Sequence, residues 1–331
     1  MLYVIFNCKM LHRIYRRIRF GLLTLLTLLI VACTSYDRVA VNADCYTVQH
    51  AAGETCVPRQ PQRVVALDSV TLEYLLSLGI RPIGTVSSAF AADLQQDLTG
   101  VADIGSTGEP NLEKILALQP DLIVGIDYYQ TIYSQSSQIA PTILYEVEHS
   151  GKWNEIFLDF AQMLQKGEVA QQVMSNYYTR LEQFKQQMGE RLKNTEVSVV
   201  RIYPNQINLY LKDSFCGTIL QDAGLSRPAA QAIAADDAQK QFGNPIQTSI
   251  SRELLVQADG DVMFVWTGEN TAEADQQAQQ KLAQLKSDPL WQKLEVVQQN
   301  KIYQVPSYWI GSGPIAANLV IDDLFKYLIE Q

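Results

Sequence analysis

A single arginine lies within an apolar segment of the sequence, where its charge needs a partner. Arg201 lies inside the apolar run SVVRIYP, between Val200 and Ile202. A charged side chain in such a run must find a partner, because a buried charge without one is costly. Two interpretations follow. Arg201 either forms an ion pair with an Asp or Glu of the same half of the chain, or donates its fork of N–H groups to the oxygens of an anionic ligand.

Aromatic residues follow three other predicted strands. Tyr128 and Tyr129 come after DLIVGI, Trp266 ends DVMFVW, and Tyr308 and Trp309 come after KIYQV. Ligands of α/β sheets lie outside the carboxyl ends of the strands, so these rings are candidates for the walls of a binding site. The alternative for each ring is that it only covers the hydrophobic core.

The composition argues against a metal-binding site and against catalysis. Beyond residue 32 the chain has two histidines, His50 and His149, whereas a bare transition metal needs several converging ligands. No GxSxG, P-loop or HExxH motif occurs. Cys216, in DSFCGTIL, has no evident base and is interpreted as a small packed residue. We expect no catalytic residue, no metal ligand and no cofactor; a secreted enzyme is the alternative.

A long amphipathic helix is predicted at about residues 168–192. No Pro interrupts it, and at about 1.5 Å per residue it would span roughly 37 Å, the width of a domain. Its apolar residues recur at steps of three and four: Ala170, Val173, Met174, Tyr177, Leu181, Phe184, Met188 and Leu192.

The sequence repeats itself on either side of this helix. NLEKILALQPDLIVGI (111–126) aligns without a gap with SRELLVQADGDVMFVW (251–266), which pairs Glu113 with Glu253 and Asp121 with Asp261. LLSLGIRP (75–82) is similar to ILQDAGLSRP (219–228). The repeat predicts an α/β fold of two lobes with short, parallel-rich sheets, joined by one long rigid helix, and a ligand site between them.

The predicted strands set the domain boundaries. They are RVVALD, PIGTV, DLIVGI and TILY in the first lobe and SVVRIY, INLYL, DVMFVW and KIYQV in the second. Segments 227–248 and 268–286 are expected outside the sheet core. We therefore expect an N-terminal lobe at 63–166, an inter-lobe helix at 167–193 and a C-terminal lobe at 194–331.

Residues 1–32 have the layout of an export signal. Residues 1–19 contain five Lys or Arg, and residues 1–32 contain no Asp or Glu. The apolar run that follows, residues 20–32, is too short to span a bilayer. The run ends in IVAC, which is similar to a lipobox, so we expect cleavage before Cys33 and a lipid on it; a signal anchor or a buried Cys is the alternative. Translation can start at Met1 or Met10. The remaining chain has 21 Lys and Arg against 35 Asp and Glu, a net charge of −14 that repels nucleic acid and anionic lipid.

Two cysteines are placed to form a disulfide in the segment 33–62. Cys45 and Cys56 flank YTVQHAAGET and face each other if the chain turns at residues 51–53 as a hairpin. Cysteine pairs of exported proteins are oxidised. Closing this loop contributes about 2 to 3 kcal/mol in the chain-entropy model. A metal pair that includes His50 is the alternative.

Eight motifs, in order, resemble one family. The chain resembles the periplasmic substrate-binding lipoproteins of iron-siderophore ABC transporters, of the ferrichrome and ferric dicitrate type, over nearly all of its mature length. The shared motifs are GETCVPRQPQRVVAL, LEYLLSLGIRPIG, GEPNLEKILALQPDLIVG, IAPT, SFCGTILQDAGLSRP, SRELL, DPLWQKLEVVQQNKIYQV and AANLVIDDL. Ferrichrome binders carry an Arg just before EPNLE, where this chain has Thr107 and Gly108.

The resemblance implies a function, a location and partners. A lipid-anchored monomer in the periplasm, or on the outer face of the cell membrane, would capture a ferric siderophore or ferric citrate. It would deliver this ligand to an ABC permease dimer with its ATPase. A cobalamin or haem carrier, with Tyr128 or Tyr129 as the axial haem ligand, is the alternative.

The resemblance also implies roles for single residues. The chelate supplies the ligands of iron, and the protein supplies aromatic and cationic contacts. The expected contact residues are Phe90, Thr107, Tyr128, Tyr129, Arg201, Trp266, Tyr308 and Trp309. Glu113 and Glu253 are expected to dock into Arg pockets of the two permease subunits; the alternative is that they only stabilise their helices through the helix dipole.

Overall fold

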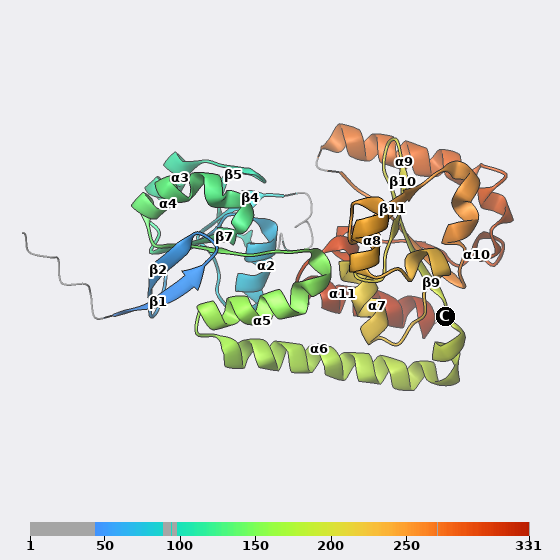
Figure 1. Cartoon of the computed structure of the whole chain (residues 1–331), viewed down its shortest axis with the longest axis horizontal. Coiled ribbons are helices and arrows are strands. Elements are labelled where there is room, and N and C mark those ends of the chain that lie inside the picture. The colour runs from blue at the N-terminus through green and yellow to red at the C-terminus, as the bar shows by residue number, and fades with distance from the viewer. Residues whose placement is uncertain (1–43, 89–93, 95–97, 270, 331) are drawn as a thin grey trace, which may run out of the picture. The chain divides into compact units, whose positions relative to one another are not determined.

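Two mixed sheets, a two-stranded hairpin and the helices around them make up the described part of the chain (Figure 1). The computed structural model describes residues 44–88, 94, 98–269 and 271–330. The predicted signal segment, Cys33 and Phe90 lie outside these ranges. Residues Tyr46–Gln331 belong to one compact unit. Within the described ranges, no helix combines the length and the apolar character that a membrane span requires.

The sheet of the N-terminal lobe has the strand order β6-β5-β4-β3-β7-β8. All neighbours pair in parallel except β5 and β6. The strands are β3 (Val64–Ala66), β4 (Gly84–Ser87), β5 (Ala102–Ser106), β6 (Glu109–Pro110), β7 (Leu122–Ile126) and β8 (Thr142–Tyr145). The helices are α2 (Ser69–Ser77), α3 (Leu112–Ala117), the 3-10 helix η2 (Asp127–Ile132) and α4 (Tyr133–Ile139). Strands β3 and β8 are buried along their whole length, as expected for a parallel sheet covered on both faces.

The sheet of the C-terminal lobe has the order β11-β10-β9-β12-β13. β12 is parallel to β9 and β13, whereas β10 is antiparallel to β9 and β11. The strands are β9 (Val197–Ile202), β10 (Ile207–Tyr210), β11 (Gln247–Ile250), β12 (Val262–Thr267) and β13 (Ile302–Gln304). The helices are α7 (Phe215–Asp222), η5 (Ala229–Gln231), α8 (Ala235–Phe242), η6 (Arg252–Ala258), α9 (Ala272–Lys286), η7 (Trp291–Lys293), α10 (Glu295–Gln298), η8 (Ser307–Ile310) and α11 (Pro314–Leu328).

An N-terminal hairpin is attached to the first sheet. It consists of β1 (Cys45–His50) and β2 (Gly53–Pro58). Cys45 and Cys56 are disulfide-bonded, which confirms that prediction. The Ala51 amide donates to the Leu144 carbonyl at 2.8 Å, and the Thr55 hydroxyl donates to the Thr142 carbonyl at 2.8 Å. These two bonds fix the hairpin to β8.

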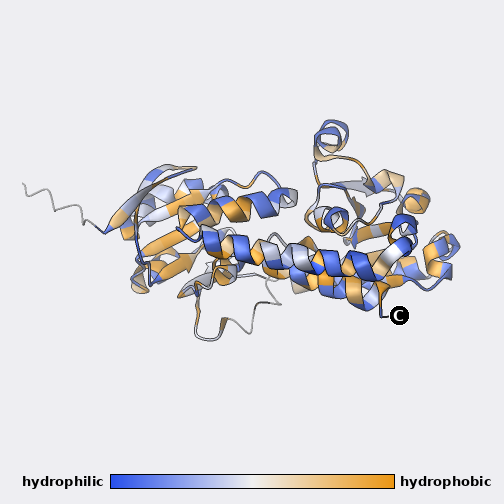
Figure 2. Cartoon of the chain, turned by 90° about the horizontal axis from the view of Figure 1, so that it is seen from below, coloured by the Kyte–Doolittle hydropathy of each residue, from blue (hydrophilic) through white to orange (hydrophobic). Residues whose placement is uncertain are grey.

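The long helix is α6 (Gly167–Met188), preceded by η3 (Ser150–Lys152) and α5 (Trp153–Met163). Hydrophilic and hydrophobic residues alternate along α6 (Figure 2), and the buried ones match the predicted periodicity: Ala170, Met174, Tyr177, Leu181, Phe184 and Met188. α6 ends before residue 192, because Gly189 has φ +55 and the chain continues as the 3-10 helix η4 (Gly189–Asn194).

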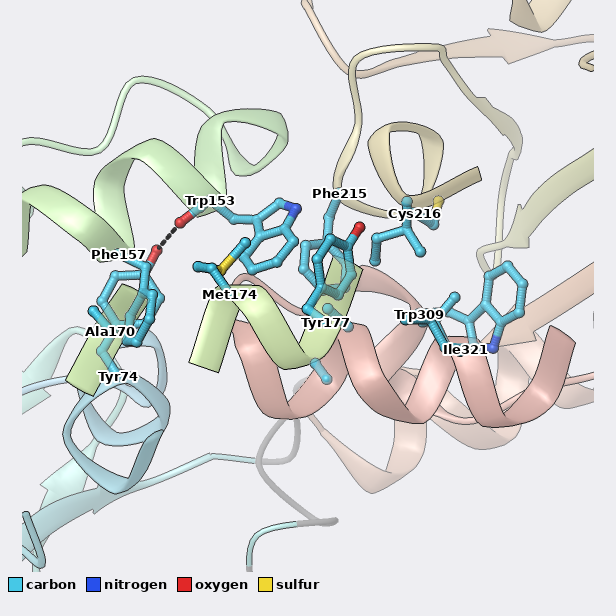
Figure 3. Close-up of a cluster of buried hydrophobic side chains, with 14 of the residues drawn as sticks. Tyr74, Trp153, Phe157, Ala170, Met174, Tyr177, Phe215, Cys216, Trp309 and Ile321 are labelled. Atoms are coloured by element: carbon cyan, nitrogen blue, oxygen red, sulfur yellow. Dashed lines mark hydrogen bonds between the residues drawn. The ribbon is translucent and has the colours of Figure 1, made fainter. Parts of the chain in front are cut away.

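One hydrophobic core includes residues of both lobes (Figure 3). The Trp153 ring of α5 lies 5.1 Å from the Tyr177 ring of α6 and 5.8 Å from the Phe215 ring of α7. The Tyr74 hydroxyl of α2 donates to the Trp153 carbonyl at 3.1 Å. The lobes are therefore connected by packed side chains as well as by the chain of α6.

The internal repeat has a structural counterpart. The Asp121 carboxylate accepts from the Gln62 and Arg63 amides at 2.7 and 2.9 Å, just before β3, the parallel neighbour of β7. The Asp261 carboxylate accepts from the Glu196 amide at 2.7 Å, just before β9, the parallel neighbour of β12. The two aligned aspartates therefore hold equivalent strand pairs together, one in each lobe.

Candidate functional site

Arg201 lies between two aromatic rings near the carboxyl end of β9. Its Cζ atom is 3.9 Å from the centroid of the Trp266 ring and 4.0 Å from that of the Tyr203 ring. Both distances are well within cation–π range. The register of the sheet produces this arrangement, because Trp266 of β12 is the direct partner of Arg201 in the β9–β12 pair. Tyr203 follows two residues after Arg201, the spacing that places two side chains on one face of an extended segment.

The guanidinium of Arg201 also has polar partners. Nη2 donates to the Gly268 carbonyl at 2.7 Å, and Nη1 donates to the Tyr210 hydroxyl at 3.4 Å. Burial raises the pKa of the Tyr210 phenol, although the nearby Arg201 charge opposes the shift. Glu269 Oε2 lies 3.7 Å from Nη2. The structure therefore contains an ion pair between Arg201 and an acid of the same lobe, but its N···O distance is longer than that of a hydrogen bond.

A cavity of 590 Å³ lies beside this cluster, at the carboxyl ends of β12 and β13. Trp266 and Glu269, which both contact Arg201, are among its lining residues. Polar side chains form much of the rest of the wall: Thr267, Thr271, Asp275, Gln279, Gln304 and Ser307. Among the described residues that line it, the cavity therefore has two carboxylates and no cationic side chain.

A second group of predicted residues gathers on the N-terminal lobe. The Tyr128 and Tyr129 rings lie edge to face, 5.4 Å apart, with Tyr128 67% exposed and Tyr129 buried. The Gly108 amide donates to the Tyr129 hydroxyl at 3.2 Å, and the Thr107 hydroxyl donates to the Ser87 carbonyl at 3.4 Å. Burial raises the pKa of the Tyr129 phenol to about 12, so this phenol is protonated at neutral pH.

Tyr308 and Trp309 are both held by Asp323 of α11. Oδ2 of Asp323 accepts from the Tyr308 hydroxyl and from Nε1 of Trp309, each at 2.8 Å. Trp309 is fully buried and stacks on Phe264 with ring centroids 4.2 Å apart. Tyr308 is half-buried and lines a cavity of 200 Å³ together with Glu73 of α2. Trp309 therefore packs in the hydrophobic core, which was the alternative to a ligand contact for this ring. Tyr308 lies at a cavity that residues of both lobes line.

The residues that sequence reasoning missed are the partners of the predicted ones. Tyr203, Glu269 and Asp323 were not singled out. Tyr203 had a detectable signal, because it stands two residues after Arg201. Asp323 also had one, since the period of the helix places this acid on the same face as the apolar residues Ala316 and Val320. Glu269 had none, because it follows its strand in a polar segment.

The two glutamates of the repeat are exposed near the starts of α3 and η6. The pKa of Glu253 is lowered by its own backbone N–H and by the Ser251 hydroxyl. The burial of the aligned residues agrees in both copies: Ile115 and Leu255 are buried, whereas Leu116 is 59% and Val256 is 67% exposed. Each glutamate therefore has an exposed aliphatic side chain three residues later.

The remaining candidate groups have structural partners. Nε2 of His50 lies 2.9 Å from the Thr55 hydroxyl, and the pKa of His50 is lowered by burial. Cys216, a free thiol, is buried, and burial raises its pKa. Within the described ranges, no three His, Cys, Asp or Glu side chains are grouped so that they could hold a metal ion.

Comparison with known proteins gives matches over most of the chain. Residues 64–309 match the family model described as periplasmic binding protein. The probable siderophore-binding lipoprotein YfiY of Bacillus subtilis (strain 168) is 34% identical over 295 residues, which cover 86% of this chain and 88% of the relative. The achromobactin-binding periplasmic protein of Dickeya dadantii (strain 3937) is 27% identical over 276 residues, 80% of this chain and 86% of the relative. Among solved structures, Staphylococcus aureus SirA complexed with staphyloferrin B has a TM-score of 0.73 and 26% identity, with 86% of this chain and 98% of SirA covered.

Proposed function

Because this chain belongs to the periplasmic binding protein family, we propose that it captures a ferric siderophore or ferric citrate outside the cytoplasm and delivers it to an ABC permease. The names of its relatives, a siderophore-binding lipoprotein and an achromobactin-binding protein, support an iron-chelate ligand. The observation that carries the proposal is the position of Arg201, a cation held between Trp266 and Tyr203 beside a cavity at the strand ends. In a ferric chelate the chelator already supplies the ligands of iron, so the protein needs to provide cationic and aromatic contacts rather than metal ligands.

The proposal includes export and a lipid anchor. We place the lipid on Cys33 and the mature protein in the periplasm or on the outer face of the cell membrane. The name lipoprotein of the Bacillus subtilis relative supports the anchor. The Cys45–Cys56 disulfide supports the location, because disulfides persist in oxidising compartments.

The ligand contacts are proposed for residues of both lobes. Thr107, Tyr128 and Tyr129 would contribute from the first lobe, and Arg201, Trp266 and Tyr308 from the second. Phe90 stays a prediction from the resemblance. Trp266 and Trp309 are both buried, but Trp266 lines the 590 Å³ cavity, whereas Trp309 stacks on Phe264 and donates to Asp323. We therefore assign Trp309 to the support of Tyr308 rather than to ligand contact.

The delivery step requires a surface that a permease can recognise. We propose that Glu113 and Glu253 dock to cationic pockets, one on each subunit of a permease dimer with its ATPase. The matching exposed residues Leu116 and Val256 support a docking role, since aliphatic side chains near a charged contact lose water when a partner covers them. The protein would act as a monomer.

A haem carrier is the alternative within the same family. An axial tyrosine ligand must lose its proton, and Tyr129, with its buried hydroxyl and a pKa of about 12, is poorly suited to that. An absorption spectrum of the purified protein separates the possibilities, because haem and cobalamin each have intense visible bands.

Ligand mass spectrometry on protein purified from iron-starved source cells tests the proposed function. We expect a co-purified small molecule whose mass includes iron and that carries several oxygen ligands. Recovery of haem or cobalamin, with no iron chelate, would contradict the proposal.

A further inference from the structure

The Arg201–Glu269 contact is close, buried and incompletely bonded. The side chains are only 10% and 17% exposed, and the shortest N···O distance between them is 3.7 Å. A charge-assisted hydrogen bond is shorter, about 2.7 to 2.9 Å. Nε of Arg201 and Oε1 of Glu269 are both buried and have no hydrogen-bond partner in the part of the chain that the structure describes. Both charges therefore retain hydrogen-bonding capacity that this contact does not use.

The unused capacity of Arg201 lies on one edge of its guanidinium. Nη1 is bonded to Tyr210 and Nη2 to Gly268, which leaves the Nε side without an acceptor. Nε and Nη2 together form the side edge that binds a carboxylate through two parallel hydrogen bonds. The carboxylate of Glu269 lies near this edge but does not make the two bonds.

Because the neighbouring cavity is lined by acidic residues, an anionic ligand can bind there only if it reaches this edge of Arg201. Glu269 and Asp275 line the cavity, and none of the described lining residues is cationic. An anionic ligand would be repelled by these two carboxylates unless it gained the charge of Arg201. Glu269 now offsets that charge at 3.7 Å.

We propose that Glu269 is a specificity-determining residue that occupies the anion position at Arg201 until a carboxylate of the ferric chelate replaces it. The inference rests on the proposed function and narrows its ligand to ferric chelates that carry a free or iron-bound carboxylate. Such a ligand can make both bonds to Nε and Nη2, and thus satisfies the edge that Glu269 leaves open. A chelate without a carboxylate has nothing to exchange for Glu269.

The variant Glu269→Gln tests the exchange, because it removes the charge and keeps the volume. The probes are ferric citrate, which is anionic, and ferrioxamine B, a cationic ferric hydroxamate. Binding is followed by quenching of tryptophan fluorescence. For ferric citrate we expect the Kd of Glu269→Gln to fall about tenfold, the order that removal of one nearby charge gives. For ferrioxamine B we expect no gain.

Two further variants separate exchange from general repulsion. Asp275→Asn removes the other carboxylate of the same cavity and should change the Kd of ferric citrate by less than about threefold, because within the described residues the ion pair of Arg201 is with Glu269 and not with Asp275. In an Arg201→Gln background, Glu269→Gln should give no gain beyond that of Asp275→Asn, because the two residues act as a pair. Circular dichroism melting confirms that each variant is folded.

Each outcome has a defined meaning. Equal gains from Glu269→Gln and Asp275→Asn would overturn the exchange and leave the proposed function standing. Binding of ferrioxamine B but not of ferric citrate, with and without Glu269, would overturn both the exchange and the carboxylate class. Failure of all variants to bind either probe would also overturn the exchange; the mass spectrum of the co-purified ligand then decides separately whether the protein carries iron.

Discussion

At the scale of single residues, Asp323 organises two of the aromatic side chains that the sequence singled out. Its carboxylate accepts one hydrogen bond from Tyr308 and one from Trp309. The side chain is buried, so its cost of desolvation is offset only while both donors are in place. Asp323 therefore connects the core position of Trp309 with the cavity position of Tyr308.

Asp323→Ala should lower the free energy of unfolding by about 2 to 4 kcal/mol, because it leaves two donors without their charged acceptor. The matched control is its neighbour Asp322, whose exposed carboxylate pairs with Arg180. Asp322→Ala should cost at most about 1 kcal/mol, the usual worth of a surface ion pair. Urea denaturation measures both. Equal costs for the two variants would contradict the role of Asp323.

Arg201→Ala should weaken the binding of an anionic ferric chelate by about 1.5 to 3 kcal/mol, the scale of a hydrogen bond to a charged group. Folding stability should also fall, because Arg201 contacts two aromatic rings and donates to Gly268 and Tyr210, and its loss leaves the buried Glu269 carboxylate without a counter-charge. Tryptophan fluorescence titration measures the affinity, and thermal melting measures the stability. Unchanged affinity together with a lower melting temperature would instead assign Arg201 to a structural ion pair.

At the scale of elements, periodicity predicted the buried face of α6 but not its end. Six of the eight predicted apolar positions are buried, whereas the helix stops at Met188 because Gly189 adopts a positive φ. Strands β5, β6 and β11 were missed, since these segments are short and largely polar and have no continuous apolar run. Segment 227–248 was expected outside the sheet, but residues 247 and 248 begin the edge strand β11. Apolar patterns indicate central strands better than edge strands.

The hairpin and α7 give a prediction on thiols. A soluble variant that starts at Thr34 contains Cys45, Cys56 and Cys216. In the native state no thiol should be alkylated, because Cys216 is buried and its pKa is raised. Denaturation without reductant should expose one thiol, and reduction should expose all three. Mass spectrometry counts them; alkylation of Cys45 or Cys56 before reduction would refute the disulfide in the purified protein.

At the scale of the whole molecule, the internal repeat was the most informative signal in the sequence. It predicted two α/β lobes, and the aligned Asp121 and Asp261 hold equivalent strand pairs in them. The candidate site was only partly predictable. The Arg201–Trp266 contact depends on the register of β9 against β12, and the approach of Glu269 depends on the chain after β12; a linear pattern contains neither.

The duplicated surface gives a prediction on transport. Glu113→Ala combined with Glu253→Ala should abolish iron uptake in cells and leave the chelate affinity of the purified protein unchanged. Leu116→Ala with Val256→Ala should reduce uptake to a smaller extent. The control is Glu182→Ala, which removes an exposed glutamate of α6 that pairs with Lys185. Wild-type uptake in the double glutamate variant would place docking elsewhere on the molecule.

The most direct test of the central claim compares one chelator with and without iron. The chelator is purified from the medium of iron-starved source cells and titrated calorimetrically into the mature protein, first as the ferric complex and then iron-free. We predict saturable one-to-one binding of the ferric complex and binding of the iron-free form that is at least about tenfold weaker, a difference of about 1.4 kcal/mol. Equal affinity for the two forms, or no binding of the ferric complex, would contradict a role in iron-chelate capture.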